Sequence, residues 1–226
     1  MRKSAKVLCS ILLLILLISV GCSKETSEPK QPQLKLKPGG HLIYGSMQEP
    51  NTLNPLLSDL LATAEVGRLI FSGLVTMNDK NQWIPDLAVE VPTVENGGVS
   101  SDGLTVTYKL RPGITWHDGV EFTAEDVKFT WQFIMNPKVN VVSREGYDRI
   151  AAISTPDKYT VVIMFKEYYA PYLTLFSTIL PRHKLADVDN YNTAHFNRAP
   201  VGTGPFKFKE WRIADAIELD ANPQYF

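Results

Sequence analysis

The stretch from residue 100 to residue 135 constrains the fold most, because it carries the signals of a strand, a turn and a capped helix without interruption. Its first part lies between two turn-forming pairs, Asp102-Gly103 and Pro112-Gly113. Apolar residues alternate there with polar ones, at Leu104, Val106, Tyr108 and Leu110. This period of two predicts a strand with one buried face and one wet face.

A capped helix is predicted directly after this strand. Thr123 stands where an N-cap residue should stand, and Asp126 follows three residues later, close to the positive end of the helix dipole. Phe122 and Val127 have the spacing of a hydrophobic staple. Further apolar residues mark one helical face, namely Phe129, Trp131, Phe133 and Ile134. We expect the helix to end at Asn136-Pro137.

The same patterns predict further elements along the chain. We expect strands at residues 42–47, 74–77, 150–154, 159–165, 206–211 and 216–219, and helices at 59–71 and 170–177. Residues 83–88 are expected to form an irregular crossing. The inward positions of the first helix are Leu61, Val66, Leu69 and Ile70, with Gly73 as its C-terminal cap. Strands and helices mixed without a regular βαβ repeat predict an α/β or α+β fold with a mixed sheet.

The N-terminus has the pattern of an export signal. Three basic residues precede an apolar run at residues 7–20, which is shorter than the roughly 20 residues of a spanning helix. We therefore expect a signal peptide at residues 1–21.

Cys22 follows this signal, and its surroundings resemble a bacterial lipoprotein signal, in which a lipid is attached to the cysteine after cleavage. Gly21 fits that pattern, whereas Ser19 replaces the usual leucine. Residues 22–38 are polar, contain prolines and lack periodicity, which predicts a flexible tether. An ordinary secretory signal with an incidental cysteine is the alternative.

Composition limits the possible functions. The chain of 226 residues is 44% hydrophobic, enough for a sizeable core, and its formal charge is −1. Removing residues 1–21 takes three of the 23 basic residues and no acidic one, which leaves 20 against 24 and a charge of about −4. This charge disfavours nucleic acid as a partner. The only other cysteine, Cys9, lies in the segment expected to be removed, so the processed chain has no internal disulfide.

The densest polar cluster lies at residues 116–126. His117 and Asp118 are residue types that serve as a general base and its orienting partner, or as metal ligands. However, Asp118 and the glycine after it form a turn pair, and Glu125 and Asp126 suit the start of a helix. We therefore favour a structural role and predict no catalytic residue, metal or cofactor. An exported hydrolase that uses His117 and Asp118 is the alternative.

Seven segments between residues 39 and 226 point to one protein family. In order they are GGHLIYGSMQEPNTLNPLL, LIFSGLVTMND, PDLAVEV, DGLTVTYKLRPGITWHDGVEFTAEDVKFTW, ILPRHKL, APVGTGPFKFKEW and ANPQYF. Together they resemble the family 5 solute-binding proteins of bacterial ABC importers, which bind oligopeptides, dipeptides or nickel.

The resemblance implies an α/β fold of the type II periplasmic-binding-protein class, in which two lobes close on a ligand by a hinge. Residues 39–75 and 201–226 are expected in the main part of the first lobe, and residues 76–200 in an extra subdomain. Family members have several hundred residues, so the resemblance also implies that the second lobe is missing and that the chain is a fragment.

The function implied is that of a lipid-anchored binding protein, monomeric at full length, on the outer side of the cytoplasmic membrane. It would capture peptides and deliver them to an ABC permease; a nickel complex or an oligosaccharide is the alternative ligand. The resemblance makes Tyr44, Glu49 and Thr203 the candidate ligand contacts, because their segments face the cleft in the family. The glycines and prolines of these segments could instead only hold sharp turns.

Overall fold

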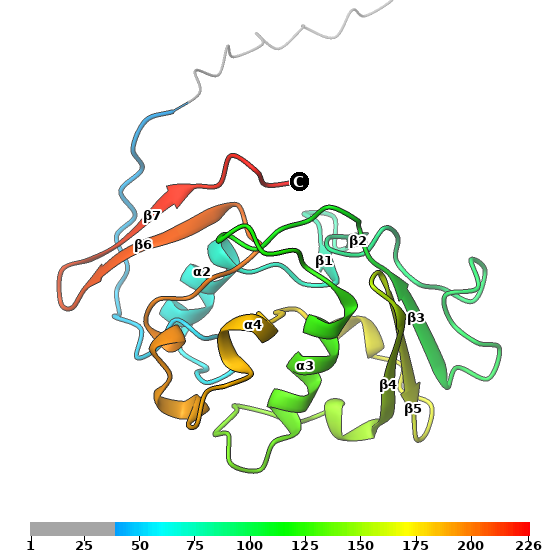
Figure 1. Ribbon diagram of the computed structural model, residues 1–226. Helices are drawn as coiled ribbons and strands as arrows, with labels where there is room; N and C mark the ends of the chain where they lie inside the picture. The colour runs from blue at the N-terminus through cyan, green and yellow to red at the C-terminus, as the bar shows by residue number, and fades with distance from the viewer. Residues whose placement is uncertain (1–38) are drawn as a thin grey trace, which may run out of the picture. The chain divides into compact units, whose positions relative to one another are not determined.

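The structure, a computed structural model, describes residues 39–226. Residues 45–226 form one compact unit, which is described here (Figure 1). The expected signal peptide, Cys22 and the tether lie outside the described residues. Within residues 39–226, no helix combines the length and the apolar character of a membrane span.

This unit contains a three-stranded antiparallel sheet, in the order β3-β5-β4. Its strands are β3 (Thr105–Lys109), β4 (Ile150–Asp157) and β5 (Thr160–Phe165). The predicted alternation in β3 is confirmed, since Val106 and Tyr108 are each 1% exposed. The strands predicted at residues 150–154 and 159–165 are also confirmed and pair as a hairpin, although β4 is longer than expected and has irregular register at two places.

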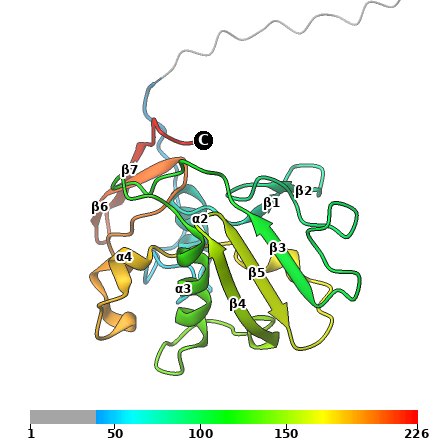
Figure 2. The same cartoon turned by 45° about the vertical axis from the view of Figure 1, so that its right-hand side comes forward.

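Helix α3 (Ala124–Met135) packs against β4 and β5, as Figure 2 shows. The predicted N-cap position of Thr123 is confirmed, and Thr123 forms a capping box with Asp126: the Asp126 carboxylate accepts a hydrogen bond from the Thr123 backbone N–H at 2.9 Å. Asp126 is buried and also accepts from the Arg182 backbone N–H at 2.9 Å and from Trp116 Nε1 at 3.4 Å. Burial raises the pKa of Asp126, although the hydrogen bonds from Thr123 and Arg182 act to lower it.

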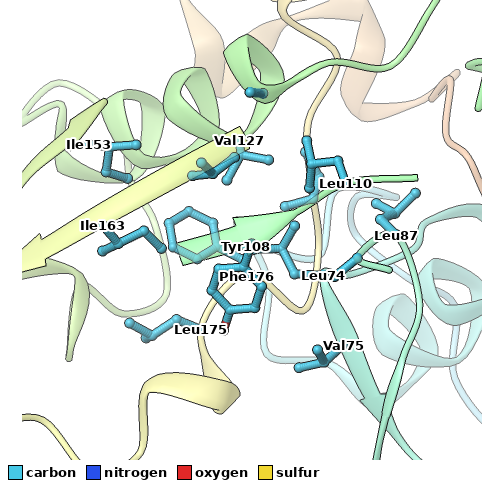
Figure 3. Close-up of a cluster of buried hydrophobic side chains, with 14 of the residues drawn as sticks. Leu74, Val75, Leu87, Tyr108, Leu110, Val127, Ile153, Ile163, Leu175 and Phe176 are labelled. Carbon is cyan, nitrogen blue, oxygen red and sulfur yellow. The ribbon is translucent and has the colours of Figure 1, made fainter. Parts of the chain in front are cut away.

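The core consists of two groups of buried side chains. The larger group lies between the sheet, α3 and the segments around Leu74 and Phe176 (Figure 3). The second group joins helix α2 (Leu61–Ile70) to α3 and to the loop before residue 200, and includes Ile70, Phe133 and Phe196. These two groups hold residues 45–226 together by apolar burial.

Helix α2 (Leu61–Ile70) differs from the prediction in the face that it buries. Leu61 and Leu69 were expected to face inward, but they are 68% and 39% exposed. The buried positions are instead Ala62, Thr63, Gly67 and Ile70. Small residues are needed there because a Cβ on Gly67 would lie 2.5 Å from Pro55 Cγ.

The expected cap at Gly73 is wrong as well. The C-cap of α2 is Phe71, in an extended conformation. Gly73 instead allows a close approach of two backbones, since a Cβ on it would lie 2.8 Å from Ser177 Cα.

Three other predictions need correction. Residues 42–47 adopt no strand, because no strand of the described residues pairs with them, and a strand needs a partner for its backbone groups. The expected irregular crossing contains β2 (Trp83–Pro85), which pairs antiparallel with β1 (Val75–Met77). The helix expected at residues 170–177 is only the short 3-10 helix η2 (Tyr172–Thr174).

Four short helices complete the chain between the longer elements. They are η1 (Tyr147–Arg149), α4 (Arg182–Leu185), η3 (Tyr191–Thr193) and η4 (His195–Asn197).

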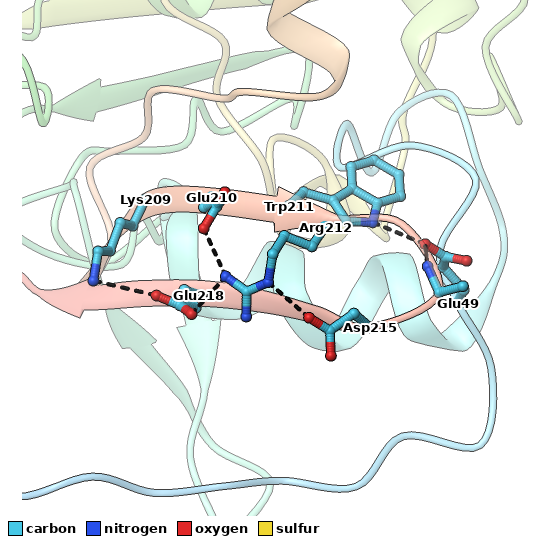
Figure 4. A network of polar contacts seen from close by, with 8 residues as sticks. Glu49, Lys209, Glu210, Trp211, Arg212, Asp215 and Glu218 are labelled. Carbon is cyan, nitrogen blue, oxygen red and sulfur yellow. Dashed lines mark hydrogen bonds and ion pairs between the residues drawn. The ribbon is translucent and has the colours of Figure 1, made fainter.

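The two strands predicted near the C-terminus are confirmed as β6 (Phe206–Arg212) and β7 (Ala216–Ala221), which pair as an antiparallel hairpin. Its Phe208 and Leu219 pack against the second core group. Its charged residues form an exposed network in which Arg212 pairs with Glu210, Asp215 and Glu218 (Figure 4). Exposed ion pairs of this kind contribute little to stability, so the apolar contacts hold the hairpin in place.

Candidate functional site

His117 and Asp118, the pair considered for catalysis, have separate partners in the structure. His117 Nε2 lies 3.0 Å from the Gly204 carbonyl oxygen, and the Gly202 N–H donates to His117 Nδ1 at 3.2 Å. Burial lowers the pKa of His117, against a smaller opposing effect of its bond to Gly204. The two hydrogen bonds of the imidazole thus join the turn after β3 to the segment before β6.

The Asp118 carboxylate contacts α4 instead. His183 Nε2 and Lys184 Nζ each lie 2.9 Å from its Oδ2. Although burial acts to raise the pKa of Asp118, the hydrogen bonds from Lys184 and His183 lower it to about 2. The carboxylate therefore has the partners of a structural ion pair and does not orient His117.

Glu49, a predicted ligand contact, joins its loop to the β6–β7 hairpin. Its Oε1 accepts from Trp211 Nε1 at 2.9 Å and from the Ala214 backbone N–H at 3.1 Å (Figure 4). A ligand would have to contact the other carboxylate oxygen of Glu49. The role of Glu49 as a ligand contact stays a prediction.

Thr203, the second predicted contact, is only 2% exposed. Its segment packs on the end of α2, because the Gly204 N–H donates to the Ile70 carbonyl oxygen at 2.8 Å. A Cβ on Gly202 would lie 1.9 Å from the same oxygen. This geometry favours the turn-holding role of the glycines. The third predicted contact, Tyr44, belongs to the separate unit that ends at residue 44, and its side chain is 70% exposed.

A recess of ≈ 470 Å³ offers a better candidate site, which the sequence predictions missed. Apolar and aromatic residues make up much of its wall, and a few hydroxyl groups and one carboxylate are interspersed. Its lining residues are Pro55, Leu56, Val142, Ser143, Glu145, Tyr147, Tyr169, Pro171, Thr174, Leu175 and Ser177. Ligand sites typically combine such apolar walls with a small number of polar groups.

One side of this recess is built on an uncommon backbone conformation. Phe176 has a φ of 58°, in the left-handed region that bulky residues rarely adopt, and its ring is fully buried. Its N–H donates to Tyr147 Oη at 2.8 Å, and its carbonyl oxygen accepts from the Leu74 N–H at 3.0 Å. These contacts hold the turn that places Leu175 and Ser177 in the wall, and strain of this kind is concentrated at functional sites.

Tyr147 also lines the recess. Burial raises the pKa of its hydroxyl to about 12, so the group stays neutral at physiological pH. Its oxygen accepts from the Phe176 N–H, so this hydroxyl helps to hold the turn beside the recess.

Residues 82–226 match the model of the bacterial extracellular solute-binding proteins, family 5, middle region. The chain belongs to this family.

Relatives within the family include the oligopeptide-binding protein AppA of Bacillus subtilis. It is 31% identical over 235 residues, which cover 100% of this chain and 42% of AppA. The structure of AppA in complex with a nonapeptide has a TM-score of 0.73 and 31% identity, covering 80% of this chain and 36% of that one. The structure of NikZ from Campylobacter jejuni in complex with Ni(L-His) has a TM-score of 0.70 and 33% identity, covering 79% of this chain and 35% of NikZ.

These likenesses identify the fold as part of a type II periplasmic-binding protein. The chain spans about two fifths of the length of AppA. In this family 5 protein, the one sequence signal that could have pointed to the recess is the presence of aromatic residues in loops near prolines, such as Tyr169 two residues before Pro171. The backbone conformation of Phe176 had no such signal.

Proposed function

We propose that this family 5 protein captures peptides outside the cytoplasmic membrane and delivers them to an ABC permease. The observation that carries the proposal is the recess at Leu56, Tyr147 and Ser177, whose wall combines apolar and aromatic residues with hydroxyl groups. The relation to AppA, an oligopeptide-binding protein, supports a peptide as the ligand.

The recess suits a peptide of variable sequence. Exposed hydroxyl groups at Ser143, Thr174 and Ser177 can bond with backbone N–H and C=O groups, which every peptide carries. The apolar wall can receive side chains of different shapes, because burial of apolar surface has no directional requirement. A single open wall removes water from only one side of the ligand, so we expect the 226-residue chain to bind peptides weakly.

We further propose that the protein is tethered to the membrane through a lipid on Cys22. The support is the lipoprotein-like signal before it and the polar composition of residues 22–38. A tether of this kind keeps the receptor at a high effective concentration beside its permease. We keep Tyr44 and the free oxygen of Glu49 as proposed secondary contacts of the ligand.

A nickel complex is the second candidate ligand. The similarity to NikZ, whose structure holds Ni(L-His), favours a metal bound together with an organic molecule.

Isothermal titration of the 226-residue chain with a mixture of nonapeptides and, separately, with nickel and L-histidine tests the proposal. We expect saturable peptide binding that Ser177→Trp abolishes by filling the recess. Ser101→Trp, on an exposed turn, is the matched control and should bind as the unmodified chain does. Binding of the nickel complex alone, or peptide binding that Ser177→Trp leaves unchanged, would contradict the proposal.

A further inference from the structure

A second recess, of ≈ 600 Å³, shares no lining residue with the first. Polar side chains dominate its wall, chiefly Asn51, Thr52, Asn192, Thr193, His195 and Arg198. The proposed peptide site therefore does not account for the polar character of this second recess.

Part of the wall is a fixed frame. The Asn197 carbonyl oxygen accepts from the Leu53 N–H at 2.7 Å and from Thr52 Oγ1 at 3.1 Å. Asn192 Oδ1 accepts from the Asn140 N–H at 2.8 Å, and its Nδ2 donates to a carbonyl oxygen at 2.8 Å. These bonds hold the two sides of the recess together.

Arg198 is held in place without being neutralised. Its guanidinium carbon lies 4.1 Å from the centroid of the Trp211 ring, and the Trp211 indole N–H is bonded to Glu49 at 2.9 Å. No carboxylate between residues 39 and 226 lies within ion-pair distance of Arg198. Stacking fixes the plane of the guanidinium and leaves the N–H donors at its edge available.

Two rim residues add hydrogen-bonding capacity. The side chains of Asn51 and His195 are exposed and form no hydrogen bond with any residue that the structure describes. An oriented arginine beside unpaired amide and imidazole groups matches a carboxylate or a phosphate, whose oxygens accept two parallel N–H bonds.

We infer that this recess binds a small molecule bearing a carboxylate or phosphate group, with Arg198 as the principal contact and Asn51 and His195 as supporting contacts. The inference does not depend on the proposed peptide site, because the two recesses have separate walls.

Calorimetric titration of the full 226-residue chain with citrate and with inorganic phosphate, at matched low ionic strength, tests this inference. We expect one saturable site for at least one of the two anions, and the preferred anion distinguishes a carboxylate from a phosphate ligand. Arg198→Gln should weaken binding about tenfold or more, because it removes charge-assisted hydrogen bonds. Arg198→Lys keeps the charge but loses the planar fork, and should bind several-fold more weakly than the unmodified chain.

Arg149→Gln is the matched control, because Arg149 is exposed and pairs with Glu167 away from the recess. It should bind as the unmodified chain does. Asn51→Ala and His195→Ala provide a second test that avoids unfolding, since neither side chain bonds to the described framework, and both should weaken binding. Absence of saturation with both anions, or equal affinities for Arg198→Gln and Arg149→Gln, would overturn the inference.

Discussion

His117 and Gly204 are joined across 87 positions of sequence by a hydrogen bond of 3.0 Å from the imidazole Nε2 to the carbonyl oxygen. At the same time His117 Nδ1 accepts from the Gly202 N–H at 3.2 Å. Only a neutral imidazole with its proton on Nε2 can form both bonds. The residue that most suggested catalysis thus connects two distant loops, and its protonation state matters for stability.

Acid should weaken this connection. Burial lowers the pKa of His117, so at mildly acidic pH the unfolded chain binds a proton that the folded chain does not. The contribution of His117 to the free energy of unfolding is therefore fully present above about pH 6.5 and is lost as the pH falls through its lowered pKa in the folded state. Urea unfolding at pH 7.5 and at lower pH measures this loss.

His117→Gln should show a smaller loss of stability over the same pH range. His195→Gln is the matched control, because His195 is exposed and forms no side-chain hydrogen bond within the described residues. An identical pH dependence in the unmodified chain and in His117→Gln would show that another group is responsible.

Gly202→Ala should be severely destabilising. The added Cβ would lie 1.9 Å from the Ile70 carbonyl oxygen, so either the end of α2 or the segment before β6 would have to move. We expect a loss of about 3 kcal/mol or more in the free energy of unfolding. Gly45→Ala, where a Cβ meets nothing within 4 Å, should change it by less than about 1 kcal/mol. Chemical denaturation of both variants checks the prediction, and a similar loss in both would refute it.

Asp126→Asn should also destabilise the fold. The buried carboxylate accepts from Thr123, Arg182 and Trp116, and an amide replaces one accepting oxygen by a donor that faces N–H groups. We expect a loss of about 1–3 kcal/mol. Glu125→Gln, one residue earlier and exposed, should stay within about 0.5 kcal/mol of the unmodified chain. Urea unfolding of both variants measures the loss. Equal losses in Asp126→Asn and Glu125→Gln would contradict the stabilising role of the buried carboxylate.

The buried Tyr108 and the half-buried Tyr147 predict opposite results of the same substitution. Among the described residues, Tyr108 Oη is a buried side-chain atom without a hydrogen-bond partner, whereas Tyr147 Oη accepts from the Phe176 N–H. Tyr108→Phe should raise the free energy of unfolding by up to about 1 kcal/mol, and Tyr147→Phe should lower it by about 1–2 kcal/mol. Thermal melting followed by circular dichroism measures both changes. Melting temperatures that shift in the same direction in the two variants would contradict the role given to the hydrogen bond of Tyr147.

The sequence by itself determined the elements whose signals are local. The strand at Val106 and Tyr108, the capping box of Thr123 and Asp126, and the two hairpins depend on alternation, turn residues and caps only a few positions apart. The family also followed from segments whose order could be read directly from the chain.

Tertiary structure alone decided the buried face of α2 and the candidate site. Leu61 and Leu69 are exposed because Pro55 packs closely on Gly67, which periodicity cannot reveal. The recess depends on Phe176 in a left-handed conformation, held by Tyr147 at a sequence distance of 29 residues. Contacts of this kind form only after the chain has folded, because their partners are brought together by the burial of shared apolar surface and not by local propensity.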